Sequence, residues 1–165
     1  QLERCFSPQH YLLLHGADAE TVDYYQRRCK DKGDVLELGC GDARVLRAVA
    51  QAPGVSGRQF IGIDNVPDFV SSSQVLPGGE GIRAIHGDIC NFTLDQKFDM
   101  IVLPSSTLFC LESTDQMLNC FKCVRRHLKS QGQLVLDTYN VDMVREDDWG
   151  FEDAIDTFES EHGKL

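Results

Sequence analysis

Short runs of apolar, strand-favouring residues alternate with helical patterns along the middle of the chain. The predicted strands are Val35–Leu38, Phe60–Asp64, Ile82–His86, Phe98–Leu103 and Gln133–Thr138. Apolar strands separated by helices indicate βαβ units, whose parallel strands are covered on both faces. With right-handed crossovers, the pattern predicts an α/β fold with a doubly wound, mostly parallel Rossmann-like sheet and helices on both faces.

Helical patterns are predicted before and between these strands. They cover Ala19–Lys30, Ala43–Gln51, Phe69–Leu76 and the segment that follows Ser113. Asp18 is placed to cap the first helix, and Ser113 with Gln116 has the spacing of a capping box for the last. The apolar stripe expected to face the core in that last helix consists of Met117, Phe121, Val124 and Leu128.

The histidines and cysteines are interpreted as structural residues. His86 falls inside the third strand and is expected in the core, whereas His127 is expected at a helix end near the surface. The seven cysteines are an odd number without regular spacing, which favours free buried thiols. Cys120 and Cys123 form a single CxxC inside a predicted helix, with no second pair to complete a zinc site.

Composition and charge exclude several classes of protein. The 165 residues are 42% apolar and 25% charged, the balance of an ordinary globular domain. No apolar run approaches a length of about 20 residues, the length that crosses a bilayer, so no membrane association and a cytoplasmic location are expected. The net charge of −10 repels a phosphate backbone, so nucleic acid is not expected as a partner. A small molecule, or a basic protein segment, is the expected substrate class.

The stretch Val35–Leu46 carries the most informative chemistry. Its strand ends in Glu37, followed by Gly39, Cys40, Gly41 and a helix start. The glycines permit a tight turn and let a ligand approach the main chain without a β-carbon in between. A dinucleotide site places a pyrophosphate over this turn and needs GxGxxG, whereas the spacing here is ExGxGxA. Because Glu37 repels phosphate, the turn favours a ligand with a cationic end, such as the amino group of a methionine moiety.

Two further acids follow the next two strands. Asp64 ends the second strand, with Asn65 beside it, and is placed to accept both hydrogen bonds of a ribose diol. Asp88 follows the third strand and is placed to accept from an adenine 6-amino group, while a backbone N–H near Ile89 faces a ring nitrogen. Each acid alone is also compatible with a helix cap or a turn. Together with Glu37, however, they favour a nucleoside-containing ligand.

These motifs resemble the class I S-adenosylmethionine-dependent methyltransferases. The chain is most similar to small, soluble methyltransferase-domain families with the pattern Glu-Leu-Gly-Cys-Gly-x-Gly-Arg, and the similarity runs from Tyr11 to Asn140. The resemblance implies S-adenosyl-L-methionine as cofactor. The cofactor-binding residues that it implies are Tyr11, Glu37, Gly39, Cys40, Gly41, Asp64, Asn65, Asp88, Ile89 and Leu103.

The resemblance also implies roles for particular segments. Glu37 and the two glycines after it are expected to hold the methionine end, and the stretch containing Tyr11 to close over the cofactor. The loop Leu103–Leu108 is expected to line the methyl-transfer pocket. Ala43 departs from the family, which has a third glycine there, and the departure is expected to be mild if the backbone at Ala43 is helical.

The C-terminal residues differ more strongly from the family. Residues 1–140 are expected to form the S-adenosylmethionine-binding domain, and residues 141–165 an acidic tail. That tail is too short for the sixth and seventh strands that complete this fold, although Ala154–Glu159 alternates enough for one strand. We therefore expect a fragment whose fifth strand is an exposed edge, which invites pairing with a second copy as a homodimer.

Three functions are compatible with these residues. The first is a methyltransferase that acts on a small-molecule acceptor, and the second is an S-adenosylmethionine-binding module without catalysis. The third is a nicotinamide-dependent oxidoreductase, which Glu37 and the missing GxGxxG disfavour. No catalytic base is assigned, because methyl transfer depends mainly on positioning. The polar residues expected near the pocket mouth are His10, His15, Ser105, Ser106 and Tyr139.

Overall fold

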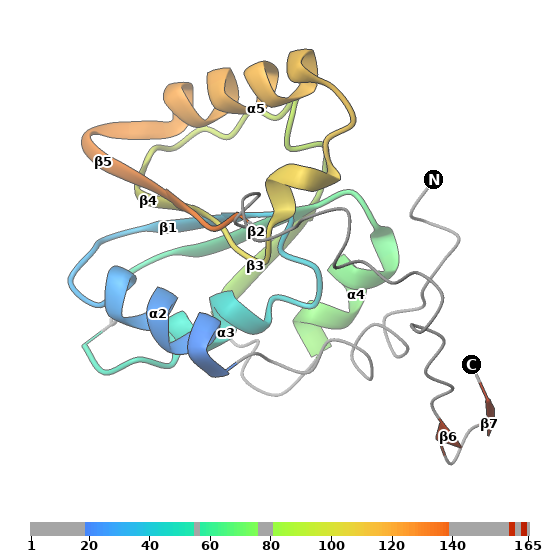
Figure 1. Cartoon of the computed structure of the whole chain (residues 1–165). Helices are drawn as coiled ribbons and strands as arrows, with labels where there is room; N and C mark the ends of the chain where they lie inside the picture. The colour runs from blue at the N-terminus through green and yellow to red at the C-terminus, as the bar shows by residue number, and fades with distance from the viewer. Residues whose placement is uncertain (1–18, 55–56, 76–80, 139–158, 161–162, 165) are drawn as a thin grey trace, which may run out of the picture.

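A five-stranded, all-parallel sheet in the order β3-β2-β1-β4-β5 forms the centre of the fold (Figure 1). The computed structural model describes residues 19–54, 57–75, 81–138, 159–160 and 163–164. The strands are β1 (Val35–Leu38), β2 (Phe60–Asp64), β3 (Ile82–His86), β4 (Phe98–Leu103) and β5 (Leu128–Leu136). The predicted α/β architecture is confirmed.

The order of the strands reverses beside β1. The chain steps from β1 through β2 to β3, and then returns to the other side of β1 as β4, so that Val35 pairs with both Phe60 and Met100. In open α/β sheets, ligands bind at the carboxyl ends of the strands, where the order reverses. The turn after β1 and the loop after β4 lie at that point.

Helices cover both faces of the sheet, with α2 and α3 on one side and α5 on the other (Figure 1). The helical elements are α2 (Ala19–Cys29), α3 (Arg44–Ala50), α4 (Pro67–Val75), the 3-10 helix η2 (Thr107–Cys110) and α5 (Thr114–His127). Adjacent residues of β1 point to opposite faces of the sheet. Val35 packs in the core between the sheet and helices α2 and α3, and Leu36 packs in the core between the sheet and α5. The predicted cap residue Asp18 lies outside the described residues.

Two details of the segment from α5 to β5 differ from the prediction. The buried residues of α5 are Cys120, Cys123, Val124 and His127. Of the predicted stripe, Val124 is buried and Leu128 packs against the core, whereas Met117 and Phe121 are only half-buried. Strand β5 begins at Leu128, directly after α5, whereas the prediction placed its start at Gln133. Its early part is polar and exposed, which removes the alternation of apolar residues by which a strand is recognised in a sequence.

His86 lies in β3 and His127 ends α5, as predicted, but the predicted burial of both histidines was wrong. His86 is exposed, and its Nε2 lies 3.1 Å from the carbonyl oxygen of Asn65. His127 is only 4% exposed. Its Nδ1 lies 2.7 Å from the carbonyl oxygen of Cys123, and its Nε2 accepts the amide hydrogen of Leu94 at 3.0 Å. His127 is therefore part of the core beneath α5.

The cysteines of the described residues are free thiols. Cys120 and Cys123 lie on the buried face of α5, in agreement with a structural role. The prediction of buried thiols is wrong for Cys110, which is exposed at the end of η2.

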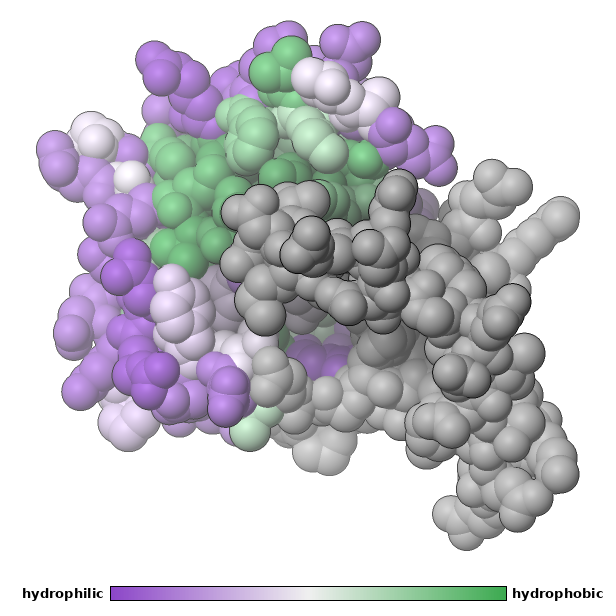
Figure 2. All heavy atoms as spheres, in the orientation of Figure 1, coloured by the Kyte–Doolittle hydropathy of each residue, from purple (hydrophilic) through white to green (hydrophobic). Residues whose placement is uncertain are grey.

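The outer edge of β5 has no neighbouring strand among the described residues. Hydrophobic side chains gather between α5 and β5 on the face shown in Figure 2. Two short strands, β6 (Glu159–Ser160) and β7 (Gly163–Lys164), form a separate antiparallel pair. In the parts of the chain that the structure describes, no helix is long and apolar enough to cross a membrane. The predicted domain boundary at residue 140 stays a prediction.

Candidate functional site

The first three amide groups of the turn after β1, those of Gly39, Cys40 and Gly41, are bonded to β2. Gly39 and Gly41 have φ of 69° and 51°, in the region that favours glycine. The amides of Gly39 and Cys40 donate to the carbonyl oxygen of Ile63 at 2.8 and 3.0 Å, and the amide of Gly41 donates to Asp64 at 2.7 Å. A phosphate cradle needs amides that point at the ligand. These three amides are therefore not available to bind an anion.

Glu37, directly beneath this turn, is a buried carboxyl group. It is 2% exposed and accepts the amide hydrogen of Leu46, but its Oε2 has no hydrogen-bond partner among the described residues. Burial, and then the nearby carboxylates of Asp42 and Asp64, raise the pKa of Glu37 well above its usual range. A buried polar atom without a partner carries a desolvation cost. A cationic group bound beside Glu37 would remove that cost and restore its charge.

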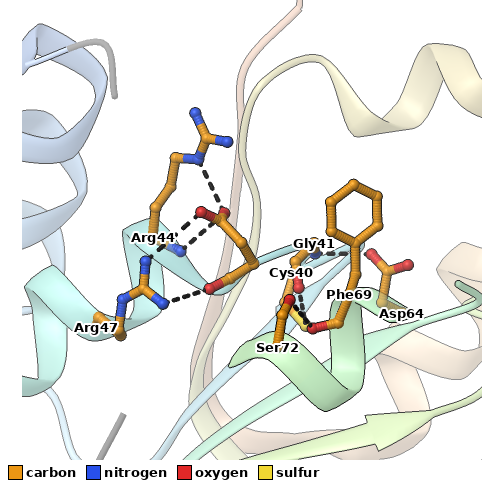
Figure 3. A network of polar contacts seen from close by, with 8 residues as sticks. Cys40, Gly41, Arg44, Arg47, Asp64, Phe69 and Ser72 are labelled. Carbon is orange, nitrogen blue, oxygen red and sulfur yellow. Dashed lines mark hydrogen bonds and ion pairs between the residues drawn. The ribbon is translucent and has the colours of Figure 1, made fainter. Parts of the chain in front are cut away.

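Asp64 is fixed by two backbone donors before any ligand is present. Its Oδ2 accepts from the amide of Gly41 at 2.7 Å (Figure 3). Its Oδ1 accepts from the amide of Val66 at 2.9 Å. Burial raises the pKa of Asp64, although these hydrogen bonds oppose the shift. Each carboxylate oxygen has further acceptor capacity. Asp64 therefore retains acceptor capacity, and its role at a ribose diol stays a prediction. Its neighbour Asn65 is exposed.

The side chain of Cys40 points into the sheet. It is 4% exposed, and a β-carbon added to Gly62 would come within 2.6 Å of its sulfur. Only the backbone of Cys40 is thus available on the ligand side of the turn. Its predicted place in the cofactor site stays a prediction, limited to main-chain contacts.

Asp88 and Ile89 follow β3 and complete the row of acids along the sheet. Asp88 is exposed, and its Oδ1 accepts the amide hydrogen of Cys90 at 2.8 Å, which closes a local turn. Ile89 is half-buried and packs against the core beneath α5. Because parallel strands end at the same edge, the fold brings Asp88 to the edge where Glu37 and Asp64 lie. Tyr11, also predicted for this site, lies outside the described residues.

Sequence reasoning missed a buried ion cluster at the start of α3. Asp42 is 2% exposed, with Arg44 Nε at 2.9 Å from its Oδ1 and Arg47 Nη2 at 3.5 Å from its Oδ2 (Figure 3). Between them Ala43 has φ 58° and ψ 29°, a left-handed conformation. The helical backbone expected at Ala43 is therefore wrong, and the missing glycine leaves a strain of about 1–2 kcal/mol. Both arginines bind Asp42, the residue directly before Ala43.

The loop after β4 contains a second strained turn, held by a carboxylate that sequence reasoning also missed. Ser105 and Ser106 have φ of 57° and 55°, and their amides donate to Asp137 at 2.9 and 2.5 Å. Tyr25 of α2 donates to the same carboxylate at 3.3 Å. Left-handed conformations of this kind cost about 1–3 kcal/mol each, and hydrogen bonds to a charged group offset much of that. Asp137 follows the fifth strand, so the signal was again an acid at a strand end.

This loop touches the turn after β1. A β-carbon added to Gly39 would come within 2.4 Å of Thr107 Cγ2, so Thr107 covers Gly39 closely. Leu103, at the end of β4, is fully buried. Its carbonyl oxygen lies 3.4 Å from the amide of Asp137 and 3.5 Å from the hydroxyl of Tyr25. The structure thus brings Leu103 to the predicted site and shows that its carbonyl already has partners.

Most of the sheet and of the site lies in the part of the chain that matches a known family. Residues 35–132, more than half of the chain, match the model described as a methyltransferase domain. The chain belongs to this family. The match contains the turn after β1, the three acids at the strand ends and the loop after β4.

Individual relatives of this methyltransferase domain agree with the assignment. The cypemycin N-terminal methyltransferase of Streptomyces sp is 26% identical over 107 residues, which are 65% of this chain and 42% of that protein. The crystal structure of a S-adenosylmethionine-dependent methyltransferase from Clostridium acetobutylicum ATCC 824 is similar, with a TM-score of 0.65 and 22% identity. The similarity covers 78% of this chain and 53% of the chain in that structure.

A structure with S-adenosylmethionine bound is among the similar folds. It is CalS10, an amino pentose methyltransferase from Micromonospora echinaspora involved in calicheamicin biosynthesis, with a TM-score of 0.59 and 24% identity over 84% of this chain and 53% of its own. The chain spans about half the length of the relatives that it matches.

Proposed function

We propose that the protein is an S-adenosylmethionine-dependent methyltransferase that acts on a small-molecule acceptor. The observation that carries this proposal is the buried Glu37, with Oε2 unpartnered among the described residues, beneath a turn in which the amides of Gly39, Cys40 and Gly41 are bonded to β2. Such a turn suits a ligand that presents a cation and is unsuited to a pyrophosphate. This also argues against the nicotinamide-dependent alternative.

The residues present fit S-adenosylmethionine. Glu37 would bind the cationic amino group of the methionine end through its Oε2, which has no hydrogen-bond partner among the described residues. Asp64, oriented by Gly41 and Val66, would accept from the ribose hydroxyls, and Asp88 would accept from the adenine amino group. Thr107, which covers Gly39, would keep the turn closed against water on the side of the loop after β4.

When bound, S-adenosylmethionine supplies a sulfonium methyl group, to which the acceptor bonds in line as the carbon–sulfur bond breaks and S-adenosylhomocysteine leaves. The protein contributes mainly by holding the reactants in place and excluding water. The loop after β4 leaves the carboxyl edge of the sheet, and its Thr107 contacts the turn after β1. We therefore place the acceptor against Ser105 and Ser106, without assigning either as a base.

Amines are the first class of acceptor to test. The net charge of −10 favours a cationic or neutral acceptor over an anionic one. The names of two relatives also point to molecules with an amino group, an N-terminus and an amino pentose. A homodimer through the outer edge of β5 and a cytoplasmic location stay predictions; light scattering tests the first.

Thermal unfolding with S-adenosylhomocysteine, and with NADH as the control, tests the cofactor. At about 100 times Kd a ligand adds roughly 2.7 kcal/mol to the free energy of unfolding, which raises Tm by about 5–10 °C for a domain of this size. A rise with S-adenosylhomocysteine alone supports the proposal, and a rise with NADH alone contradicts it. Binding without turnover of any amine on a panel would favour the alternative of a binding module without catalysis.

A further inference from the structure

Asp137 joins three elements at the carboxyl edge of the sheet. It follows β5 directly, its carboxylate accepts from the amides of Ser105 and Ser106 in the loop after β4, and Tyr25 of α2 donates to the same group. Its own amide lies 3.4 Å from the carbonyl oxygen of Leu103. Asp137 therefore fixes where the loop after β4 leaves the sheet.

The conformation that Asp137 holds is one that serine rarely adopts. Two successive residues, Ser105 and Ser106, have positive φ, and both turn their amides toward the same carboxylate. Successive amides in such a turn form a concave anion site, which Asp137 fills from within the chain. Without an acceptor for these two amides, serine at both positions would favour the right-handed or extended region instead.

The held loop ends on the turn after β1. Thr107 follows the two serines, donates from its hydroxyl to the carbonyl oxygen of Pro104 at 2.6 Å, and places its methyl group against Gly39. A continuous path of contacts thus runs from Asp137 through the loop to Gly39. Relaxation of the loop would move Thr107 away from the turn that receives the methionine end.

We propose that Asp137 is a positioning residue for cofactor binding, which acts by holding Ser105 and Ser106 in the left-handed conformation and thereby Thr107 against Gly39. This inference rests on the proposed function, because it takes Gly39 as part of the S-adenosylmethionine site. It differs from a purely structural role in its consequence, since the affinity of the folded protein for the cofactor depends on Asp137.

Calorimetric titration with S-adenosylhomocysteine, well below the unfolding temperature, tests the inference. In Asp137→Asn the backbone N–H of Ser105 or of Ser106 would face the NH2 group of the asparagine, which cannot accept a hydrogen bond. The affinity for S-adenosylhomocysteine should therefore fall by about tenfold or more. The triple variant Asp137→Asn, Ser105→Gly, Ser106→Gly should regain most of that affinity, because glycine adopts positive φ without a carboxylate to hold it.

Asp99→Asn is the matched control. Asp99 also accepts a backbone amide, that of Asp34 at 2.8 Å, but at the opposite end of the sheet, where it pairs with Lys129. This variant should lower Tm and leave the affinity for S-adenosylhomocysteine unchanged. If Asp137→Asn unfolds, hydrogen exchange in the unchanged protein decides: S-adenosylhomocysteine should slow exchange of the Ser105 and Ser106 amides, and unaltered exchange would overturn the inference.

The outcomes separate this inference from the proposed function. An unchanged protein that does not bind S-adenosylhomocysteine would overturn both. Normal binding by the unchanged protein, together with equal affinity in Asp137→Asn, would overturn the inference alone. A loss of affinity that the two glycines do not restore would also overturn it, because the backbone conformation would then not be what Asp137 controls.

Discussion

The carboxylate of Asp64 accepts the amide hydrogen of Gly41 at 2.7 Å and so ties the end of β2 to the turn after β1. Its other oxygen accepts from Val66 at the start of the next turn. A side chain held by two backbone donors loses little further freedom when a ligand arrives, which favours tight binding. Asp64 is thus both a structural link between two strands and a preorganised acceptor.

The first prediction concerns Asp64→Ala. The substitution removes the two charge-assisted hydrogen bonds that we propose Asp64 makes to the ribose, each worth about 1.5–3 kcal/mol. The free energy of binding S-adenosylhomocysteine should therefore weaken by about 3–6 kcal/mol. Calorimetry at low temperature keeps the variant folded during the measurement. Asp95→Ala removes an exposed carboxylate from the opposite end of the sheet and should have no effect. Equal affinities of Asp64→Ala, Asp95→Ala and the unchanged protein for S-adenosylhomocysteine would mean that the ribose lies elsewhere.

The second prediction concerns Glu37 and pH. Burial raises the pKa of Glu37 above that in the unfolded chain. The stability that it contributes is therefore full below the unfolded-state pKa and is lost as pH rises through the folded-state pKa. Glu37→Gln cannot ionise, so between about pH 5 and pH 9 its Tm should fall less than that of the unchanged protein. Differential scanning calorimetry without ligand measures this; parallel pH curves would assign the pH dependence to other groups.

Glu37→Gln also separates stability from binding. Glutamine retains an oxygen for the amide of Leu46 but has no charge to offer a cationic ligand. The variant should therefore give no Tm rise with S-adenosylhomocysteine, even where it is more stable than the unchanged protein. A full rise would contradict the assignment of Glu37 to the methionine end.

The strand ends were predictable because chemistry and geometry agree there. Strand β1 and strand β2 end at the predicted residues, where buried apolar runs give way to Gly39 and to Asp64 with its neighbour Asn65. Parallel topology alone then places Glu37, Asp64 and Asp88 at one edge. A sequence pattern is informative when, as here, each local preference points to the same arrangement.

The contacts of Asp137 with the loop after β4, and those of Asp42 with its two arginines, were not predictable from periodicity. Asp137 acts through residues more than thirty positions away in the sequence, and nothing in a run of apolar residues indicates which backbone amides will face a given carboxylate. The positive φ values at Ala43 and Ser106 are likewise set by Asp42 with its arginines and by Asp137, since neither residue favours that conformation by itself.

The third prediction uses the two histidines that were misassigned. His127 lies on the face of α5 that carries Cys120, Cys123 and Val124, a helical spacing that should have identified it as buried. His127→Ala leaves the amide of Leu94 without an acceptor and removes the ring stacked on Phe92, so it should cost about 2–4 kcal/mol.

His86→Ala is the matched control, because His86 is exposed and should change the free energy of unfolding by less than about 0.5 kcal/mol. Urea denaturation of both variants gives the comparison. Equal losses would show that burial of His127 is not what stabilises this region.

The last prediction tests the contact between β2 and the turn after β1. A β-carbon at Gly62 would lie 2.6 Å from Cys40 Sγ and 2.8 Å from Cys40 Cβ, so Gly62→Ala should destabilise the protein by about 1–3 kcal/mol. Cys40→Gly removes both atoms. The double variant should therefore be less destabilised than the sum of the single variants, as expected for residues in direct contact.

The same variants show whether the Cys40 side chain takes part in binding. Because it points into the sheet, the double variant should keep the Tm rise with S-adenosylhomocysteine, provided that the turn retains its amide bonds to Ile63 and Asp64. Additive losses of stability would contradict the close approach of Cys40 to Gly62. Restored stability without a Tm rise would instead place the Cys40 side chain in the cofactor site, against the orientation described above.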